Sequence, residues 1–374
     1  MSYTEATLQL LSPEGRLVES DASAEYLPLI QQLTDQQLRE FHRVMVVTRA
    51  FDVEATNLQR QGQMGLWVPS MGQEAAQVGS GFAARPQDHV FPAYREHAIA
   101  HIRGVDYVDI VRMLRGLTHG GWDPREKNNF HIYTLVIGSQ SLHATGYAMG
   151  IQLDGDTNTG DPERDRAVIV YFGDGATSQG DVSEALVFAA SYQTPEVFFL
   201  QNNQWAISVP VSTQSRTPLY LRPSGFGIPG IQIDGNDVLI SYAATRKAMD
   251  EARSGQGPRF IEALTYRIGA HTSSDDPTKY RTQEELEHWM ALDPITRFAS
   301  YLRGRGEGEE FFRDVDAEAA DTASDVRRRT LELGIPPVEN MFDNVYSEPH
   351  PLMQQQKQWL ADYEASFDAE GAAE

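Results

Sequence analysis

The sequence AVIVYFGDG, from Ala167 to Gly175, contains the pattern that decides the fold. Its apolar run, Ala167 to Phe172, is typical of a strand buried on both faces, and Gly-Asp-Gly follows directly. A second apolar run, Val197 to Leu200, comes after a helical pattern over Val182 to Tyr192 and leads into Asn202-Asn203. Strand, helix and strand in this order predict a right-handed crossover between neighbouring parallel strands.

The chain beyond Asn203 repeats this alternation. The pattern predicts a short strand over Ile231 to Ile233, a helix over Val238 to Arg253 and a further strand over Phe260 to Ile268. Strands that alternate with helices of this length indicate an α/β fold, with a largely parallel sheet flanked by helices on both faces.

Upstream of these strands the chain shows mainly helical patterns. Thr34 is the predicted N-cap of a helix from Asp35 to Gln61, and another helix is expected over Tyr107 to Leu117. The domain organisation that we expect is an N-terminal extended arm over residues 1–33, the α/β domain over 34–295 and a C-terminal helical extension over 296–374, with a peripheral helix over Gln354 to Phe367.

Composition and charge narrow the class of protein. The chain has 374 residues, of which 41% are hydrophobic, and no cysteine, so it has a sizeable core but no disulfide, thiolate metal site or cysteine nucleophile. A formal net charge of −22 opposes nonspecific binding to nucleic acid or anionic membrane, so an anionic ligand needs local positive charge. Because the N-terminus is acidic and no apolar run is long enough to span a membrane, we expect a cytoplasmic protein.

Polar side chains follow two neighbouring strands at the points where the strands are predicted to end. Asp174 lies between two glycines, and 26 residues separate Gly175 from Asn202-Asn203. Because open α/β sheets bind ligands at the carboxyl ends of their strands, we expect a carboxylate and a carboxamide side by side at that edge. The glycines let the backbone approach a phosphate, and the helix beginning near Asp181 is expected to direct N–H groups toward it.

Oxygen ligands of this kind suit Mg²⁺, which takes one or two carboxylates and completes its coordination with phosphates and water. The chemistry therefore favours a metal-bound diphosphate. Either half of the pattern alone is an ordinary turn, and only both halves at this spacing indicate a site.

Gly-Asp-Gly, a spacer of this length and Asn-Asn form the signature of the thiamine-diphosphate enzymes, which this sequence resembles. AYREH, from Ala93 to His97, and YRIGAH, from Tyr266 to His271, resemble segments of the alpha subunit of the two-subunit 2-oxo acid dehydrogenases. NNQWAIS, from Asn202 to Ser208, and DGNDV, from Asp234 to Val238, are also similar to that family. The likeness covers roughly residues 40–350.

The resemblance implies a cofactor site. Asp174, Asn203 and the main-chain carbonyl of Trp205 would bind Mg²⁺, and Tyr94 and Arg95 would bind the diphosphate of thiamine diphosphate.

Further residues complete the site that the resemblance implies. Ile137 is at the position of a bulky aliphatic residue that supports the bent cofactor, and His271 is at that of an active-site histidine beside the diphosphate. The other cofactor-binding residues are Gly173, Gly175, Ala176, Ile207 and Arg267.

The sequence departs from the family at two positions. Branched-chain members commonly place an arginine just before Asn-Asn, where this chain has Gln201, so Arg95 and Arg267 are expected to supply more of the positive charge. Mammalian members are phosphorylated on a serine after the histidine, where this chain has Thr272, so kinase control is not expected.

The resemblance also implies partners and a reaction. The glutamate that activates the cofactor lies on a second homologous domain in this class, so a beta subunit is expected to supply it within an α2β2 heterotetramer that docks on a lipoyl acyltransferase core. The reaction implied is oxidative decarboxylation of a branched-chain 2-oxo acid, such as 3-methyl-2-oxobutanoate, with acyl transfer to lipoyl groups. Pyruvate is the alternative substrate, and a non-catalytic, cofactor-binding assembly subunit is the alternative of another class.

Other motifs are incomplete. Gly173 to Ser178 lacks the third glycine of a dinucleotide fingerprint, and the acidic stretch from Asp154 lacks the glycine and glutamate of a calcium loop. His97 and His101 lack the glutamate of the zinc-peptidase pattern. A structural role is expected for three further histidines, His119, His131 and His143.

Overall fold

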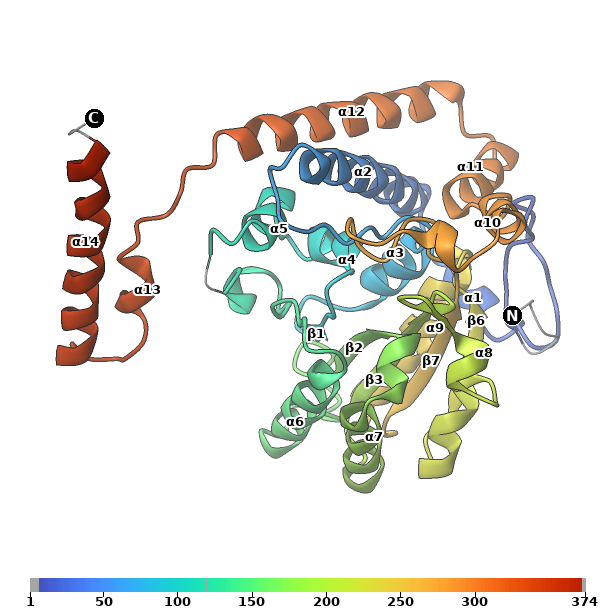
Figure 1. Cartoon of the computed structure of the whole chain (residues 1–374). Helices are drawn as coiled ribbons and strands as arrows, with labels where there is room; N and C mark the ends of the chain where they lie inside the picture. Colours follow the sequence, from blue (N-terminus) through green and yellow to red (C-terminus); the bar gives the residue numbers. More distant parts are fainter. Residues whose placement is uncertain (1–6, 119, 372–374) are drawn as a thin grey trace. The chain divides into compact units, whose positions relative to one another are not determined.

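The computed structural model describes residues 7–118 and 120–371 (Figure 1). The chain divides after Leu331 into two compact units. The domain boundaries expected from the sequence, after residues 33 and 295, stay a prediction.

A parallel sheet built from five described strands forms the centre of the first unit (Figure 1). The strand order is β1-β2-β3-β7-β6, and each neighbouring pair is parallel. This confirms the α/β fold with a largely parallel sheet. The strands are β1 (His89–Phe91), β2 (Val168–Gly173), β3 (Glu196–Asn202), β6 (Gly230–Asp234) and β7 (Arg259–Leu264), and a separate antiparallel pair is formed by β4 (Trp205–Ala206) and β5 (Val209–Pro210).

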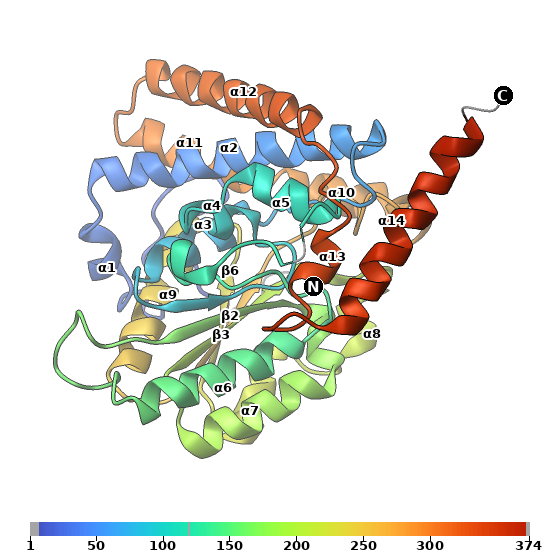
Figure 2. The same cartoon turned by 90° about the vertical axis from the view of Figure 1, so that its left-hand side faces the viewer.

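Helices cover both faces of this sheet in layers (Figure 2). On one face α3 packs against α9, α2 lies over α3 and α12 runs along α2, whereas α6 and α7 cover the other face. The α-helices of this unit are α1 (Leu27–Gln31), α2 (Asp35–Arg60), α3 (Glu74–Ala83), α4 (His97–Ile102), α5 (Tyr107–Leu114), α6 (Ser139–Leu153), α7 (Gly180–Tyr192), α8 (Val211–Gln214), α9 (Val238–Arg253), α10 (Gln283–Met290), α11 (Pro294–Gly304) and α12 (Glu309–Leu331). Short 3-10 turns are η1 (Pro124–Glu126), η2 (Asp174–Ser178), η3 (Leu219–Phe226) and η4 (Pro277–Lys279).

The second unit contains α13 (Asn340–Asp343) and α14 (Pro351–Gly371), which pack on each other. α14 confirms the helix predicted over Gln354 to Phe367. Its Trp359 and Tyr363 rings stack 5.4 Å apart and are about half exposed. In neither unit is a described helix long and apolar enough to cross a membrane.

Several predicted elements agree closely with the structure. The helix expected after Thr34 is α2, where Thr34 accepts a hydrogen bond from Gln37 N and the Gln37 side chain accepts from Thr34 N, a reciprocal capping box. The helix expected over Val238 to Arg253 is α9, with the same bounds.

Other predictions were wrong in part. The strand expected to reach Ile268 ends at Leu264. Thr265 N still donates to Asn202 O at 2.9 Å, but Ile268 N donates to Met71 O, outside the sheet, so the chain has left the sheet by that point. The arm expected to be extended over residues 1–33 contains α1. The helix expected to reach Leu117 ends at Leu114, since Gly116 adopts a left-handed φ of 75°.

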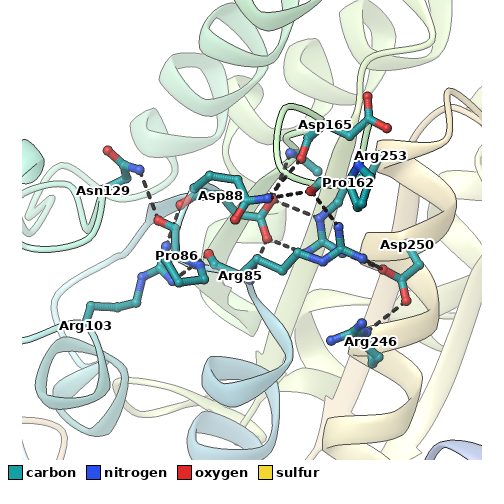
Figure 3. Close-up of polar contacts among 12 residues, drawn as sticks. Arg85, Pro86, Asp88, Arg103, Asn129, Pro162, Asp165, Arg246, Asp250 and Arg253 are labelled. Carbon is teal, nitrogen blue, oxygen red and sulfur yellow. Dashed lines mark hydrogen bonds and ion pairs between the residues drawn. The ribbon is translucent and has the colours of Figure 1, made fainter. Parts of the chain in front are cut away.

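A buried ion-pair network fixes the amino ends of β1 and β2 (Figure 3). Asp88 is fully buried and accepts from Arg253 Nε at 3.0 Å, from Arg253 Nη2, from Ala167 N at 3.0 Å and from Arg85 N at 2.7 Å. Arg253, at the end of α9, also pairs with Asp250 at 2.7 Å. The network therefore joins α9 and two neighbouring strands at the end of the sheet opposite to Gly173.

Candidate functional site

A cavity of about 250 Å³ opens at the carboxyl ends of β2 and β3. The parallel register pairs Gly173 with Gln201, so the residues that follow in the two strands come together. All site residues predicted from the sequence except Arg267 line this cavity: Tyr94, Arg95, Ile137, Gly173, Asp174, Gly175, Ala176, Asn203, Trp205, Ile207 and His271.

Three oxygen atoms converge at the edge of the sheet. The Oδ1 of Asn203 lies 3.2 Å from Asp174 Oδ1 and 3.2 Å from the carbonyl oxygen of Trp205. In this amide orientation Asn203 Nδ2 donates to Gln73 Oε1 at 3.3 Å, and no proton lies between the three oxygens, whereas the reversed amide would donate to both neighbours. In the first orientation the three oxygens face one another as acceptors, an arrangement suited to a cation.

The spacing of these oxygens fits Mg²⁺. Metal–oxygen bonds of about 2.1 Å place adjacent corners of an octahedron roughly 3.0 Å apart. Among the residues that the structure describes, no group of three His, Cys, Asp or Glu side chains could hold a metal, and the oxygens that meet here come from one carboxylate, one amide and the main chain. Burial raises the pKa of Asp174 to about 6, and a bound cation would favour its ionised form.

Two buried arginines bring positive charge to the site. Arg95 is 6% exposed and Arg267 is completely buried, and in the described part of the chain neither forms an ion pair with a carboxylate. Arg95 donates instead to Pro69 O and to His271 O at 3.2 Å, and its guanidinium lies 5.6 Å from the ring centre of Tyr94. Since burying an uncompensated charge is costly, the pair is suited to an anionic ligand.

Arg267 lies directly behind the cavity wall. It donates to the carbonyl oxygens of Trp205 at 2.9 Å and Ile207 at 2.8 Å, and so holds the backbone that carries the third converging oxygen. Burial, together with the charge of Arg95, lowers the pKa of Arg267. This residue therefore acts on the site through the backbone of β4 and the turn that follows it.

His271 lies between the two arginines. Its Nδ1 is 3.3 Å from Arg95 Nη2 and 3.3 Å from Arg267 Nη1. Because a guanidinium only donates, Nδ1 is the acceptor and Nε2 carries the proton of the neutral ring. Burial and then the two arginines lower the pKa of His271 to about 3, so the imidazole is neutral near pH 7.

Glycine 175 allows a close approach of two segments at the cavity. A Cβ atom at Gly175 would lie 2.8 Å from the Ala206 Cβ, so a side chain there would displace the β4 segment. The helix expected to begin near Asp181 starts at Gly180, and the 3-10 turn η2 precedes it. This turn, rather than α7, borders the cavity, because Gly-Asp-Gly continues directly into it.

Five of the described glutamine or glutamate residues line the cavity, and the sequence interpretation assigned none of them to the site: Gln73, Glu96, Gln140, Gln179 and Gln201. Gln201 Nε2 donates to Glu96 Oε1 at 2.6 Å, and Arg95 N donates to Glu96 Oε2 at 3.2 Å. Burial raises the pKa of Glu96 to about 7. Gln140 also lines the cavity, and its buried Oε1 has no hydrogen-bond partner in the described structure. The position of Glu96 directly after Arg95 is a signal that was available, whereas Gln140 had none.

The remaining histidines do not line the cavity. His131 stacks on Phe91 at 3.8 Å, and its Nε2 lies 3.2 Å from His89 Nδ1. Burial lowers the pKa of His131 to about 4. His143 is absent from the lining as well, and His119 lies outside the described residues.

A parallel α/β sheet with a polar cavity and two buried arginines at the carboxyl ends of its strands is typical of α/β proteins that bind a ligand at this edge. The chain belongs to the dehydrogenase E1 component family, whose sequence model matches residues 42–325. Family membership implies an enzyme that depends on thiamine diphosphate.

Two relatives illustrate the similarity. The 3-methyl-2-oxobutanoate dehydrogenase subunit alpha of Mycobacterium tuberculosis is 43% identical over 363 residues, which are 96% of this chain and 95% of the relative. The pyruvate dehydrogenase E1 component subunit alpha of Staphylococcus aureus is 38% identical over 301 residues, 80% of this chain and 77% of the relative.

Proposed function

We propose that this chain is the alpha subunit of a 2-oxo acid dehydrogenase that uses thiamine diphosphate and Mg²⁺ to decarboxylate a branched-chain 2-oxo acid and transfer the acyl group to lipoyl groups. The mycobacterial relative, named for 3-methyl-2-oxobutanoate, supports this substrate because its similarity extends over 96% of the chain. Pyruvate is the second candidate, supported by the staphylococcal relatives at 36% to 38% identity.

The observation that carries the proposal is the meeting of three oxygens and two unpaired arginines at one sheet edge. Asp174, Asn203 and the Trp205 carbonyl would hold Mg²⁺, whose charge would offset that of the diphosphate. Arg95, backed by the Tyr94 ring, would bind the diphosphate from the other side. Backbone groups of the Gly173–Ala176 turn also face this space.

The residues around the metal would orient the cofactor and substrate. When bound, thiamine diphosphate supplies a thiazolium ring that stabilises the carbanion left by decarboxylation. Ile137 would support the bent cofactor, and the Nε2–H of His271 would donate to an oxygen of the diphosphate or the substrate.

The proposed assembly is an α2β2 heterotetramer in the cytoplasm, docked on a lipoyl acyltransferase core, in which the beta subunit supplies the cofactor-activating glutamate. Two observations support an incomplete site: the relatives are named as alpha subunits, and apolar side chains are exposed at the cavity and beside it. Leu135 is 58% exposed, Val136 71% and Ile207 54%. Apolar surface of this kind is typical of an interface.

Replacing Asp174 tests the proposal. Asp174→Ala should reduce Mg²⁺-dependent binding of thiamine diphosphate at least about 100-fold, because it removes the charged metal ligand. Calorimetry on the complex with the beta subunit measures this affinity, and the melting temperature checks the fold. Glu184→Ala, at an exposed acidic residue of α7, is the matched control. Unchanged affinity in the Asp174 variant would refute the metal assignment.

A further inference from the structure

Asp52, on α2, is a buried carboxylate outside the cavity. It is 1% exposed and forms no ion pair among the residues that the structure describes. Its Oδ1 accepts from Trp67 Nε1 at 2.6 Å, and its Oδ2 accepts from the backbone N–H groups of Ser70 and Met71, both at 2.8 Å. All of its close donors therefore belong to one short stretch, the Trp67–Met71 segment.

The Trp67–Met71 segment is neither helix nor strand, so side-chain contacts determine its position. The Trp67 ring is fully buried, stacks on His97 at 4.6 Å and meets Phe51 edge to face at 5.2 Å. Asp52 fixes the indole nitrogen at one end of the segment and two backbone N–H groups at the other. The segment is thus held at both ends by one carboxylate.

The opposite side of this segment contacts the diphosphate site. The Pro69 carbonyl accepts a hydrogen bond from Arg95 Nη1. Since no described carboxylate pairs with the Arg95 guanidinium, its orientation depends on three acceptors: Pro69 O, the His271 carbonyl and His271 Nδ1. A shift of the segment would therefore shift the guanidinium.

The loop that carries His271 is attached to the same segment at two points. Met71 O accepts from Ile268 N at 3.0 Å, on one side of His271. Ser273, on the other side, donates from its backbone N to Trp67 O at 2.9 Å and accepts at Oγ from Trp67 N at 3.0 Å. The histidine is therefore held between two contacts to the segment.

We propose that Asp52 is a positioning residue for the diphosphate site. Its carboxylate aligns the Trp67–Met71 segment, which in turn orients the Arg95 guanidinium and the loop from Ile268 to Ser273. The inference rests on the proposed function, which assigns Arg95 and His271 to the cofactor.

Asp52→Asn is the variant that tests this role, since its amide nitrogen cannot accept from Ser70 N or Met71 N. Hydrogen–deuterium exchange of the full chain, bound to its beta subunit but without cofactor, should rise at residues 67–71 and also at 268–275. Affinity for thiamine diphosphate at saturating Mg²⁺ should fall about tenfold. The Mg²⁺ concentration dependence should not change, because Asp52 contacts none of the three converging oxygens.

Thr48→Val is the matched control. Thr48 lies one turn earlier on α2, is 1% exposed and hydrogen-bonds Tyr107 Oη at 2.9 Å, away from the segment. A merely structural role for Asp52 predicts that both variants lose melting temperature and affinity alike. The inference predicts that only the Asp52 variant shows increased hydrogen–deuterium exchange at residues 268–275 and binds thiamine diphosphate more weakly. If the Asp52 variant does not fold, Trp67→Phe, which removes the N–H donor and the five-membered ring of the indole but keeps an aromatic side chain, should show the same two effects more weakly.

The outcomes separate the two proposals. Two results for Asp52→Asn would overturn its role as a positioning residue. One is increased exchange at residues 67–71 with no change at 268–275, and the other is a loss of cofactor affinity equal to that of Thr48→Val. A wild-type complex that does not bind thiamine diphosphate would contradict the proposed function instead. The exchange measurement without cofactor would still show whether Asp52 controls the order of residues 67–71 and 268–275.

Discussion

Single residues at the cavity show how the charge balance of the site is set. The family pattern has an arginine where this chain has Gln201, and the Gln201 amide is bound to Glu96 rather than directed at a phosphate. Positive charge near the cavity comes from Arg95 in its wall and from Arg267 behind the wall. Glu96 directly follows Arg95 and lines the same wall, so its ionisation changes the net charge that a diphosphate meets.

Glu96 should make cofactor affinity depend on pH. Burial raises the pKa of Glu96 to about 7, so the carboxyl is neutral below that pH and charged above it. A raised pKa also means that the neutral form stabilises the fold at low pH and that this contribution is lost as pH rises through about 7. Between pH 6 and pH 8, wild-type affinity for thiamine diphosphate should fall roughly three- to tenfold more than that of Glu96→Gln. Calorimetry at both pH values measures the difference, and parallel profiles would contradict it.

At the scale of elements, the two ends of the sheet differ in role: the amino ends of the strands are tied to a helix, and the carboxyl ends form the cavity. The amino ends of β1 and β2 are joined to α9 through Asp88 and Arg253, and the carboxyl ends of β2 and β3 form the cavity. A change at one end is therefore expected to affect stability without altering the site.

Asp88→Asn should lower the free energy of unfolding by about 3 to 5 kcal/mol, because it leaves the buried Arg253 guanidinium with only the partly exposed Asp250 as a charge partner. Chemical denaturation measures this loss. Cofactor affinity should stay within about twofold of wild type at a temperature where the variant is folded. Asp250→Asn, at a partly exposed partner of the same arginine, is the control and should cost less than about 1 kcal/mol. Equal losses in both variants would argue against a central role for Asp88.

The loop from Gly269 to Lys279 has few apolar side chains, so its order should depend on what its polar groups contact. Asp275 accepts from His271 N at 2.8 Å and from Tyr280 Oη. Thiamine diphosphate with Mg²⁺ should therefore protect the loop from limited proteolysis. His271→Ala should lose most acyl transfer yet keep much of its cofactor affinity, because Arg95 and the metal ligands remain. Equal cleavage with and without cofactor, or wild-type transfer by the variant, would leave His271 a structural role only.

At the scale of the whole molecule, the chain is expected to need its partner. The cavity and its surroundings expose apolar side chains, and the proposed site lacks the glutamate that activates the cofactor. The purified chain alone should show no decarboxylation of 3-methyl-2-oxobutanoate or pyruvate, and co-purification with the beta subunit should restore it. A complex that contains Asp174→Ala should stay inactive, which controls for contaminating enzyme. Full turnover by the isolated chain would contradict this prediction.

The sequence by itself determined the elements whose pattern is local. β2, α7, β3 and α9 follow from apolar periodicity within single windows, and Gly-Asp-Gly with Asn-Asn identified the sheet edge because both follow adjacent strands. β1 escaped prediction, since three residues are too few to show a period. α6 also escaped prediction, because its apolar residues do not gather on one clear face.

Only the tertiary structure decided which distant residues meet. Glu96 and Gln201 are 105 positions apart, and Ser273 is 206 positions from Trp67. Neither contact leaves a trace in local periodicity, because each joins residues that meet only when distant segments of the chain pack together. The same reason applies to Asp52, whose sequence context is an ordinary helix and whose role depends on the segment folded against it. Local pattern reports which face of an element is buried, whereas the partner of a buried polar group is set by the packing of the whole chain.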